Sequence, residues 1–281
     1  MPEASVLIEK METMKTLPDI AVRLTRMISD DSSSLQEFEE VIRLDPTLVL
    51  RLLKIVNSPY YALASKVDSI AEAVAFVGMD NLRNLIVVDI FKHIVKSGSS
   101  DDEFNRVNLW RHSAAVGVAS QMVSERIFES KGENAFLCGL IHDIGMMIED
   151  QVEPDLLLKA YNAWESDPDN ILDYENKVIG TCHTQLGYLI AKDWNLPKEV
   201  QEGIRDHHES KKQVNPTSIS GIVQLAEYLV NRMEFSLLPG TGCPLPQSLL
   251  AHMHTRIREY KAVVMDLPEI IEKSDDIFGL D

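Results

Sequence analysis

Cysteine is scarce in this chain of 281 residues, and Cys138, Cys182 and Cys243 form no CxxC pair. An odd, scattered set argues against a disulfide framework and fits a reducing compartment. Long hydrophobic runs are also missing: no stretch of about 18 apolar residues occurs, so we expect no membrane-spanning helix. The charges of Glu9 and Lys10 interrupt the first segment, which argues against a secretion signal. These absences predict a cytoplasmic protein.

Basic residues are in deficit. Lysine and arginine number 27 against 44 aspartates and glutamates, which gives a formal net charge of −17. This balance argues against nonspecific binding to nucleic acid or to an anionic membrane surface. We therefore expect neither nucleic acid nor membrane as a partner, while a local basic pocket for one phosphate stays open.

Strands are not indicated, because no convincing alternation of apolar and polar residues occurs. Helical signals are frequent instead. Asp45 followed by Pro46 is typical of a helix start, and apolar residues then recur at helical spacing over residues 48–56. Ser69 and Glu72 form a capping-box pattern. The sequence predicts an all-α fold.

The same signals predict how the helices are grouped. In the second half, helices are expected over residues 107–128, 134–150, 153–165, 171–194, 197–209 and 217–234. A serine- and aspartate-rich stretch at 96–102 is the expected hinge. We predict a two-lobed domain with an N-terminal helical lobe (1–105), a second helical lobe (106–235), and a C-terminal helical extension and tail (236–281).

Histidine carries the strongest chemical signal. Five of the eight histidines fall into short clusters in the second lobe, and an aspartate follows one of them. They are His112, His142 with Asp143, His183, and the pair His207 and His208. Each lies near or inside an apolar helical stretch, where a polar side chain needs a partner. A divalent cation is a partner that satisfies several such groups at once.

Packing alone explains any one of these clusters. His112 fits a core or capping histidine, and His207 and His208 fit a solvated helix end. Four clusters in this order are hard to produce by packing, which favours a metal site. A scaffold whose histidines are packed and hydrogen bonded without metal remains the alternative. Cys138, one turn before His142, is interpreted as a small buried hydrophobe.

The order of the clusters resembles the HD superfamily of metal-dependent phosphohydrolases, and its HD-GYP branch most closely. The final aspartate of that branch is replaced here by Glu227, which is longer by one methylene group. The resemblance implies one or two divalent ions, with iron expected and manganese, nickel or zinc as alternatives. The implied ligands of one ion are His112, His142, Asp143 and Glu227, with Asp143 bridging to a second ion at His183, His207 and His208.

The N-terminal half resembles HDOD domains, the HD-related output domains of bacterial signalling. The motifs are Leu17 with Pro18, Asp45 with Pro46, and residues 52–58, 69–74 and 77–82, and the likeness covers residues 15–235. The resemblance implies a regulatory output module that acts mainly through contacts with other signalling proteins.

Two departures from the enzymes bear on catalysis. Met146 follows the His-Asp-Ile-Gly segment where the enzymes often have lysine, and residues 210–213 replace the expected Gly-Tyr-Pro segment. We therefore expect a non-catalytic or weakly catalytic module. The alternative is a metal-dependent phosphohydrolase acting on a phosphate-containing ligand, with Arg111, Arg205 or Lys192 as helpers, and whether the protein is an enzyme stays open.

Overall fold

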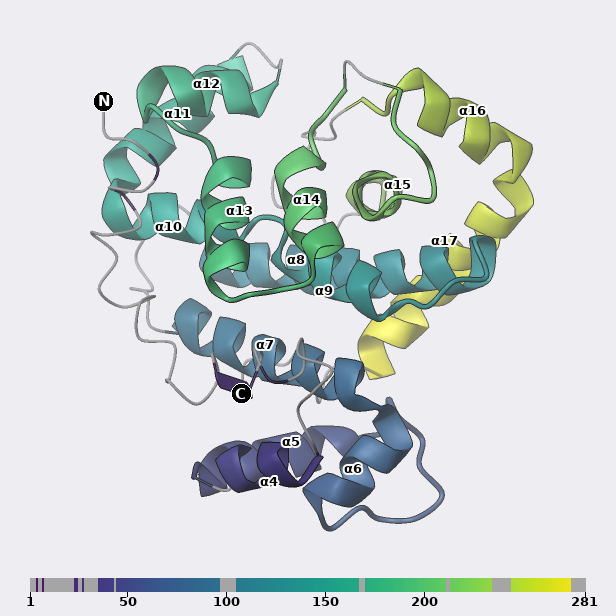
Figure 1. Cartoon of the computed structure of the whole chain (residues 1–281). Coiled ribbons are helices and arrows are strands. Elements are labelled where there is room, and N and C mark those ends of the chain that lie inside the picture. The colour runs from purple at the N-terminus through teal and green to yellow at the C-terminus, as the bar shows by residue number, and fades with distance from the viewer. Residues whose placement is uncertain are drawn as a thin grey trace.

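The computed structural model of this chain is built from helices. It describes residues 4, 7, 23, 24, 27, 35–42, 44–96, 105–166, 170–210, 213–233 and 244–273. Throughout these residues every regular element is a helix, which confirms the all-α prediction (Figure 1). Cys243 and most of the expected hinge lie outside the described residues.

Among the described residues, four helices form the lower part of the molecule in Figure 1. They are α4 (Leu35–Ile42), α5 (Pro46–Val56), α6 (Ile70–Val77) and α7 (Met79–Lys96), and they pack against one another. The Asp45 side chain accepts hydrogen bonds from the backbone N–H groups of Thr47 and Leu48, each at 3.0 Å. These bonds confirm the predicted start of α5, because they satisfy donors that a helix N-terminus leaves free.

The capping box at α6 is also confirmed, with one difference. Ser69 Oγ accepts from the Glu72 N–H at 3.1 Å, while Glu72 reaches back to the N–H of Asp68 rather than Ser69. Gly78 then ends the helix at φ +82° and ψ 162°, a conformation that favours glycine. The chain turns there directly into α7.

A larger group of helices lies above α7. It contains α8 (Arg106–Met122), its π-helical continuation η1 (Val123–Ile127), α9 (Glu133–Ile141), α10 (Ile144–Val152), α11 (Pro154–Ser166), α12 (Ile171–Val178), α13 (His183–Asp193), α14 (Lys198–Asp206) and α15 (Ile219–Asn231). Buried α8 packs on α9 and α15, while α13 packs on α10 and α14. Helix α7 contacts both α8 and α9, and Arg83 Nη2 donates to Asn134 Oδ1 at 2.7 Å across this junction.

Two predicted helices are each broken into a pair. The single helix expected over 134–150 was wrong, because α9 ends at Ile141 and α10 begins at Ile144. His142 Nδ1 lies 2.8 Å from the carbonyl oxygen of Gly139, so this side chain satisfies a carbonyl that a continuing helix would use. The helix expected over 171–194 was also wrong, because Gly180 adopts φ +95° and ends α12.

Two more helices follow α15. They are α16 (Gln247–Thr255) and α17 (Ile257–Lys273). Buried Tyr260, Val263 and Leu267 belong to α17, which packs against α8 and η1. In the described part of the chain, no helix combines the length and the hydrophobicity needed to cross a membrane.

Candidate metal centre

Helix ends place most of the histidines predicted to form a site. His142 and Asp143 occupy the break between α9 and α10, and His183 is the first residue of α13. His207 directly follows α14. Three separate helix ends contribute to one region, because His183 and His207 both lie within 3.5 Å of the Asp143 carboxylate. His112 reaches the same region from the middle of α8.

A close crossing of α10 and α13 brings His183 to this region. A Cβ atom added to Gly145 would lie 2.0 Å from the backbone oxygen of His183. No side chain fits in that gap, so the approach of the two helices depends on glycine at this position. His183 thereby lies close to Asp143, two residues before Gly145.

The Asp143 carboxylate is the centre of the cluster. Its Oδ2 lies 3.1 Å from His142 Nε2 and 4.0 Å from His112 Nε2. Its Oδ1 lies 3.3 Å from His207 Nε2 and 3.5 Å from His183 Nε2. The carboxylate therefore faces one pair of imidazoles with each oxygen.

Two sets of donor atoms that include Asp143 are close enough to share an ion. One set comprises His112, His142 and Asp143, and the other comprises Asp143, His183, His207 and His208. Asp143 belongs to both, as a bridging carboxylate would. Neutral imidazole nitrogens and carboxylate oxygens suit iron, manganese, nickel or zinc.

Buried polar atoms without partners support this fit. Within the described structure, His142 Nε2 and Asp143 Oδ1 make no hydrogen bond, and both residues are buried. The contact between His142 and Asp143 is short enough for a hydrogen bond but lacks its alignment. An orphaned donor or acceptor costs about 1–3 kcal/mol in a folded protein. A bound cation would satisfy both atoms.

The pKa values of the residues in this cluster depend on one another. Burial opposes the protonation of His142, but the neighbouring Asp143 carboxylate outweighs it and raises the pKa of His142 to about 9. Burial also acts against ionisation of Asp143, yet His142 and the other imidazoles hold the pKa of Asp143 well below its ordinary value. Burial lowers the pKa of both His207 and His208, which favours their neutral, ligating form.

Glu227, on α15, lies beside this cluster but belongs to neither donor set. Burial raises its pKa, while His142 acts in the opposite direction. It lines a small hollow of ≈ 40 Å³ together with His112, Asp143 and His208. The structure thus brings six of the seven predicted residues into the two donor sets and leaves Glu227 at their edge.

The remaining walls of this hollow are mostly apolar or aromatic. They are formed by Met146, Tyr161, Trp164, Ile171 and Asn231. Among the described residues, no lysine or arginine lines the hollow. The cations suggested by the sequence lie elsewhere: Arg111 and Lys192 are exposed, and Arg205 pairs with Asp206 through two hydrogen bonds.

Two buried glutamates were missed by the sequence analysis. Glu175 and Glu149 are each 0% exposed and lie with His183 in a third set of closely spaced donor atoms. Burial and the nearby Glu175 raise the pKa of Glu149 well above its ordinary value. A signal for Glu175 does exist, since it occupies the face of α12 that also carries Ile171, four residues earlier.

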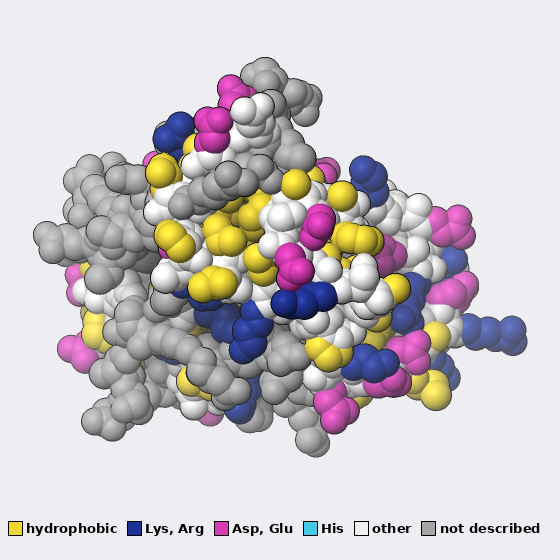
Figure 2. All heavy atoms as spheres, turned by 90° about the horizontal axis from the view of Figure 1, so that it is seen from below, with side chains coloured by type: hydrophobic (Ala, Val, Ile, Leu, Met, Phe, Trp, Pro, Cys, Tyr) yellow, Lys and Arg dark blue, Asp and Glu magenta, His cyan; other side chains and the backbone are white. Residues whose placement is uncertain are grey.

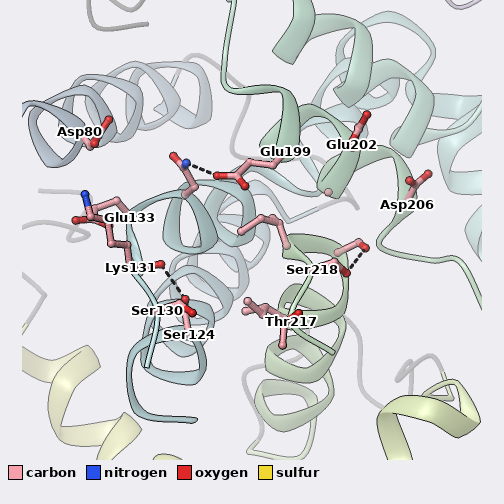
Figure 3. A pocket seen from close by; sticks show the side chains of 15 residues that line it. Asp80, Ser124, Ser130, Lys131, Glu133, Glu199, Glu202, Asp206, Thr217 and Ser218 are labelled. Carbon is pink, nitrogen blue, oxygen red and sulfur yellow. Dashed lines mark hydrogen bonds between the residues drawn. The ribbon is translucent and has the colours of Figure 1, made fainter. Parts of the chain in front are cut away.

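A larger hollow lies apart from the histidines. Its volume is ≈ 620 Å³, and it is lined by residues of α7, η1, α9, α14 and α15, with no histidine among the described lining residues. Figure 3 shows the acidic side chains around it, including Glu199, whose carboxylate accepts from Asn134 at 2.5 Å. This larger hollow is therefore acidic, and the candidate metal ligands do not line it.

Comparison with known proteins identifies related chains. The HDOD domain family matches residues 14–210. An uncharacterized protein of Treponema pallidum (strain Nichols) is 28% identical over 212 residues, which cover 73% of this chain and 39% of that protein. The chain thus spans well under half the length of this curated relative.

Two solved structures share the fold. One, named provisionally as a phosphohydrolase, comes from Shewanella amazonensis SB2B, with a TM-score of 0.72, 21% identity, and coverage of 98% of this chain and 97% of that one. The other, named provisionally as a signal transduction protein, comes from Marinobacter aquaeolei VT8. Its TM-score is 0.71 at 19% identity, with coverage of 93% of this chain and 59% of that one.

Proposed function

Because the chain belongs to the HDOD domain family, we propose that it is a regulatory signalling module that holds one or two divalent metal ions and acts through protein contacts. The observation that carries the proposal is the buried Asp143 carboxylate, within 4.0 Å of four imidazole Nε2 atoms. Such a group is costly to bury without compensating charge. A metal ion compensates for it directly.

The residues of the two donor sets are the proposed ligands. His112 and His142 would hold one ion with Asp143, and Glu227, which lines the same hollow, would join them. The second set would hold the other ion through His183, His207 and His208. Iron is the proposed metal, with manganese, nickel or zinc as alternatives, since all accept imidazole and carboxylate donors. When bound, the ion supplies positive charge and Lewis acidity.

The walls of the small hollow favour regulation over hydrolysis. A space of ≈ 40 Å³ is far below the roughly 300–1,000 Å³ typical of small-molecule sites. Met146 lines it at the position where the related enzymes often have lysine. Phosphoryl transfer needs cations against the developing negative charge, and besides the proposed ion the described side chains of this hollow include no lysine or arginine.

Apolar surface on the lower helices supports a role in protein contacts. Leu44, Leu50 and Phe76 are 65%, 68% and 56% exposed, and all lie in or beside α4–α6. Figure 2, which views the molecule from below, shows apolar side chains gathered near the middle of that face among scattered charged ones. Exposed apolar patches often mark sites of protein association.

A metal-dependent phosphohydrolase is the second candidate. The retained His and Asp series favours it, and the structurally similar Shewanella protein carries a phosphohydrolase name. In this alternative, the buried donor groups would position the ion, and a phosphate ester would approach through the hollow beside His208. Tyr161 and Trp164 line that approach.

A turnover assay separates the two candidates. The protein is first loaded with Fe²⁺ or Mn²⁺ and its metal content measured, and is then incubated with nucleotides, phosphomonoesters and cyclic dinucleotides. We expect loading without turnover. Turnover that disappears in both H142A and D143A would overturn the regulatory proposal and establish the hydrolase. An H254A variant, altered at an exposed histidine of α16, is the matched control.

A further inference from the structure

We propose that Glu175 is a positioning residue for the metal centre: it fixes the orientation and tautomer of His183, so that Nε2 faces Asp143. The inference rests on the proposed function, because a fixed orientation of His183 matters only if this residue binds a metal ion. Glu175 contacts Nδ1, the other nitrogen of the ring, and would not itself coordinate the ion.

The contacts of Glu175 converge on one residue. Its Oε2 accepts the backbone N–H of His183 at 3.0 Å, and both carboxylate oxygens lie 2.8 Å from His183 Nδ1. An ionised carboxylate only accepts hydrogen bonds, so Nδ1 must carry the proton. Nε2 is then the atom left to ligate, and it lies 3.5 Å from Asp143 Oδ1 and 3.4 Å from His207 Nε2.

Helix geometry explains why His183 needs this partner. His142 and His207 stand at the C-terminal ends of α9 and α14, and their Nδ1 atoms bond to carbonyl oxygens three residues earlier, at 2.8 and 2.7 Å. His183 begins α13, where a helix presents N–H donors and no carbonyl. Glu175 supplies the missing acceptor from the preceding helix.

The same carboxylate also completes the start of α13. Cys182, at the N-cap position, makes no side-chain capping bond, and Glu175 accepts the N–H of His183 in its place. Negative charge is favourable at a helix N-terminus. Glu175 is 0% exposed, and both of its described partners belong to His183. A buried carboxylate with this arrangement orients a histidine as outer-shell carboxylates of metal sites do.

The closing experiment compares three proteins: wild type, E175Q and E149Q. Glutamine at position 175 retains the shape of the side chain but replaces one acceptor oxygen with an NH₂ group. That NH₂ group would face either the backbone N–H or the Nδ1–H of His183, both of which are donors. Glu149 lies in the same buried cluster without a hydrogen bond to His183, so E149Q is the matched control. The readouts are Mn²⁺ affinity by titration, the visible spectrum of the Co²⁺-loaded protein, and the His183 tautomer by nitrogen-15 NMR of the metal-free protein.

We expect E175Q to weaken Mn²⁺ binding by about 10–100-fold, the range for outer-shell partners of ligating histidines. The visible spectrum of Co²⁺-loaded E175Q should change. Where His183 is neutral, the Nδ1–H tautomer should no longer dominate in E175Q. E149Q should resemble wild type in all three readouts. Wild-type affinity and spectrum in E175Q would overturn the inference, as would an equal loss in E149Q. If E175Q fails to fold, the tautomer of wild-type His183 decides instead: a proton on Nδ1 supports the inference, and a proton on Nε2 overturns it.

The two proposals fail in different ways. If wild type takes up no metal, the proposed function fails. The tautomer measurement still tests Glu175, since it needs no ion. A wild-type His183 with its proton on Nε2 would contradict the positioning role whatever the metal result.

Discussion

Asp143 divides four imidazoles into two pairs, with His112 and His142 toward one oxygen and His183 and His207 toward the other. A carboxylate is suited to this position because each of its oxygens accepts independently. The imidazoles around it differ in pKa. Burial lowers the pKa of His207, whereas Asp143 raises the pKa of His142 by more than burial lowers it. Asp143 and burial thus act in opposite directions on the pKa values of these imidazoles.

Removing that carboxylate should remove both candidate sites. We expect D143A to lower metal affinity by at least about tenfold, since even outer-shell partners contribute that much. Metal content after dialysis checks the loss. H254A, which changes an exposed histidine outside the cluster, should keep wild-type content. Equal metal content in D143A and wild type would show that the ions, if present, bind elsewhere.

Sequence spacing predicted six residues that the structure brings together, but it did not predict Glu175 beside them. His142 and Asp143 are recognisable because a polar pair interrupts an apolar stretch. Glu175 gives a weaker signal, as it lies on a helix with polar neighbours at Asp173 and Asn176. Its burial depends on how α12 folds back onto α13, which local periodicity does not encode.

At the scale of elements, helix ends organise the site. The breaks between α9 and α10 and between α12 and α13 were both missed, because apolar periodicity continues across them. The side chain of His142 ends α9, and Gly180 ends α12. A helix end at Gly180 could have been predicted from the sequence, because glycine is common just after a helix. The hydrogen bond of His142 to a carbonyl oxygen could not.

The crossing of α10 and α13 should be intolerant of any side chain at Gly145. We expect G145A to destabilise the fold by about 1–3 kcal/mol or more, because its Cβ would meet the His183 backbone. It should also abolish metal uptake by displacing His183. Urea unfolding and metal content measure the two effects.

G78A is the control for stability alone. A Cβ at Gly78 meets nothing within 4 Å, but its φ of +82° strains any side chain. The expected cost is about 1–3 kcal/mol with metal uptake retained. Should G145A bind metal like wild type, the crossing would not be what positions His183.

The start of α5 provides a prediction away from the site. We expect D45A to lower the free energy of unfolding by about 1 kcal/mol and D45N to stay near wild type, because asparagine also caps. Hydrogen bonds from Thr47 and Leu48 lower the Asp45 pKa. Its stabilisation is therefore present above the unfolded pKa and is lost as pH falls through the lower folded pKa. Urea unfolding of the three proteins near neutral and at acidic pH measures this, and equal stability of D45A and wild type at neutral pH would contradict it.

Over the whole molecule, the charge and the fold class were accessible from the sequence. The net charge of −17 and the helical periodicity need no tertiary information. The arrangement of the helices does, since α7 reaches the site-bearing helices through contacts such as Arg83 with Asn134, 51 positions apart. These contacts join the lower helices to α9, next to the break that carries His142 and Asp143.

The most direct test of this account is elemental analysis of protein produced without a histidine tag under metal-replete growth. We predict about one to two divalent ions per chain, with iron the most abundant, because a preformed and ligand-rich site fills when metal is available. Less than about 0.2 ions per chain would contradict the metal centre and leave the buried histidines and carboxylates as a hydrogen-bonded scaffold.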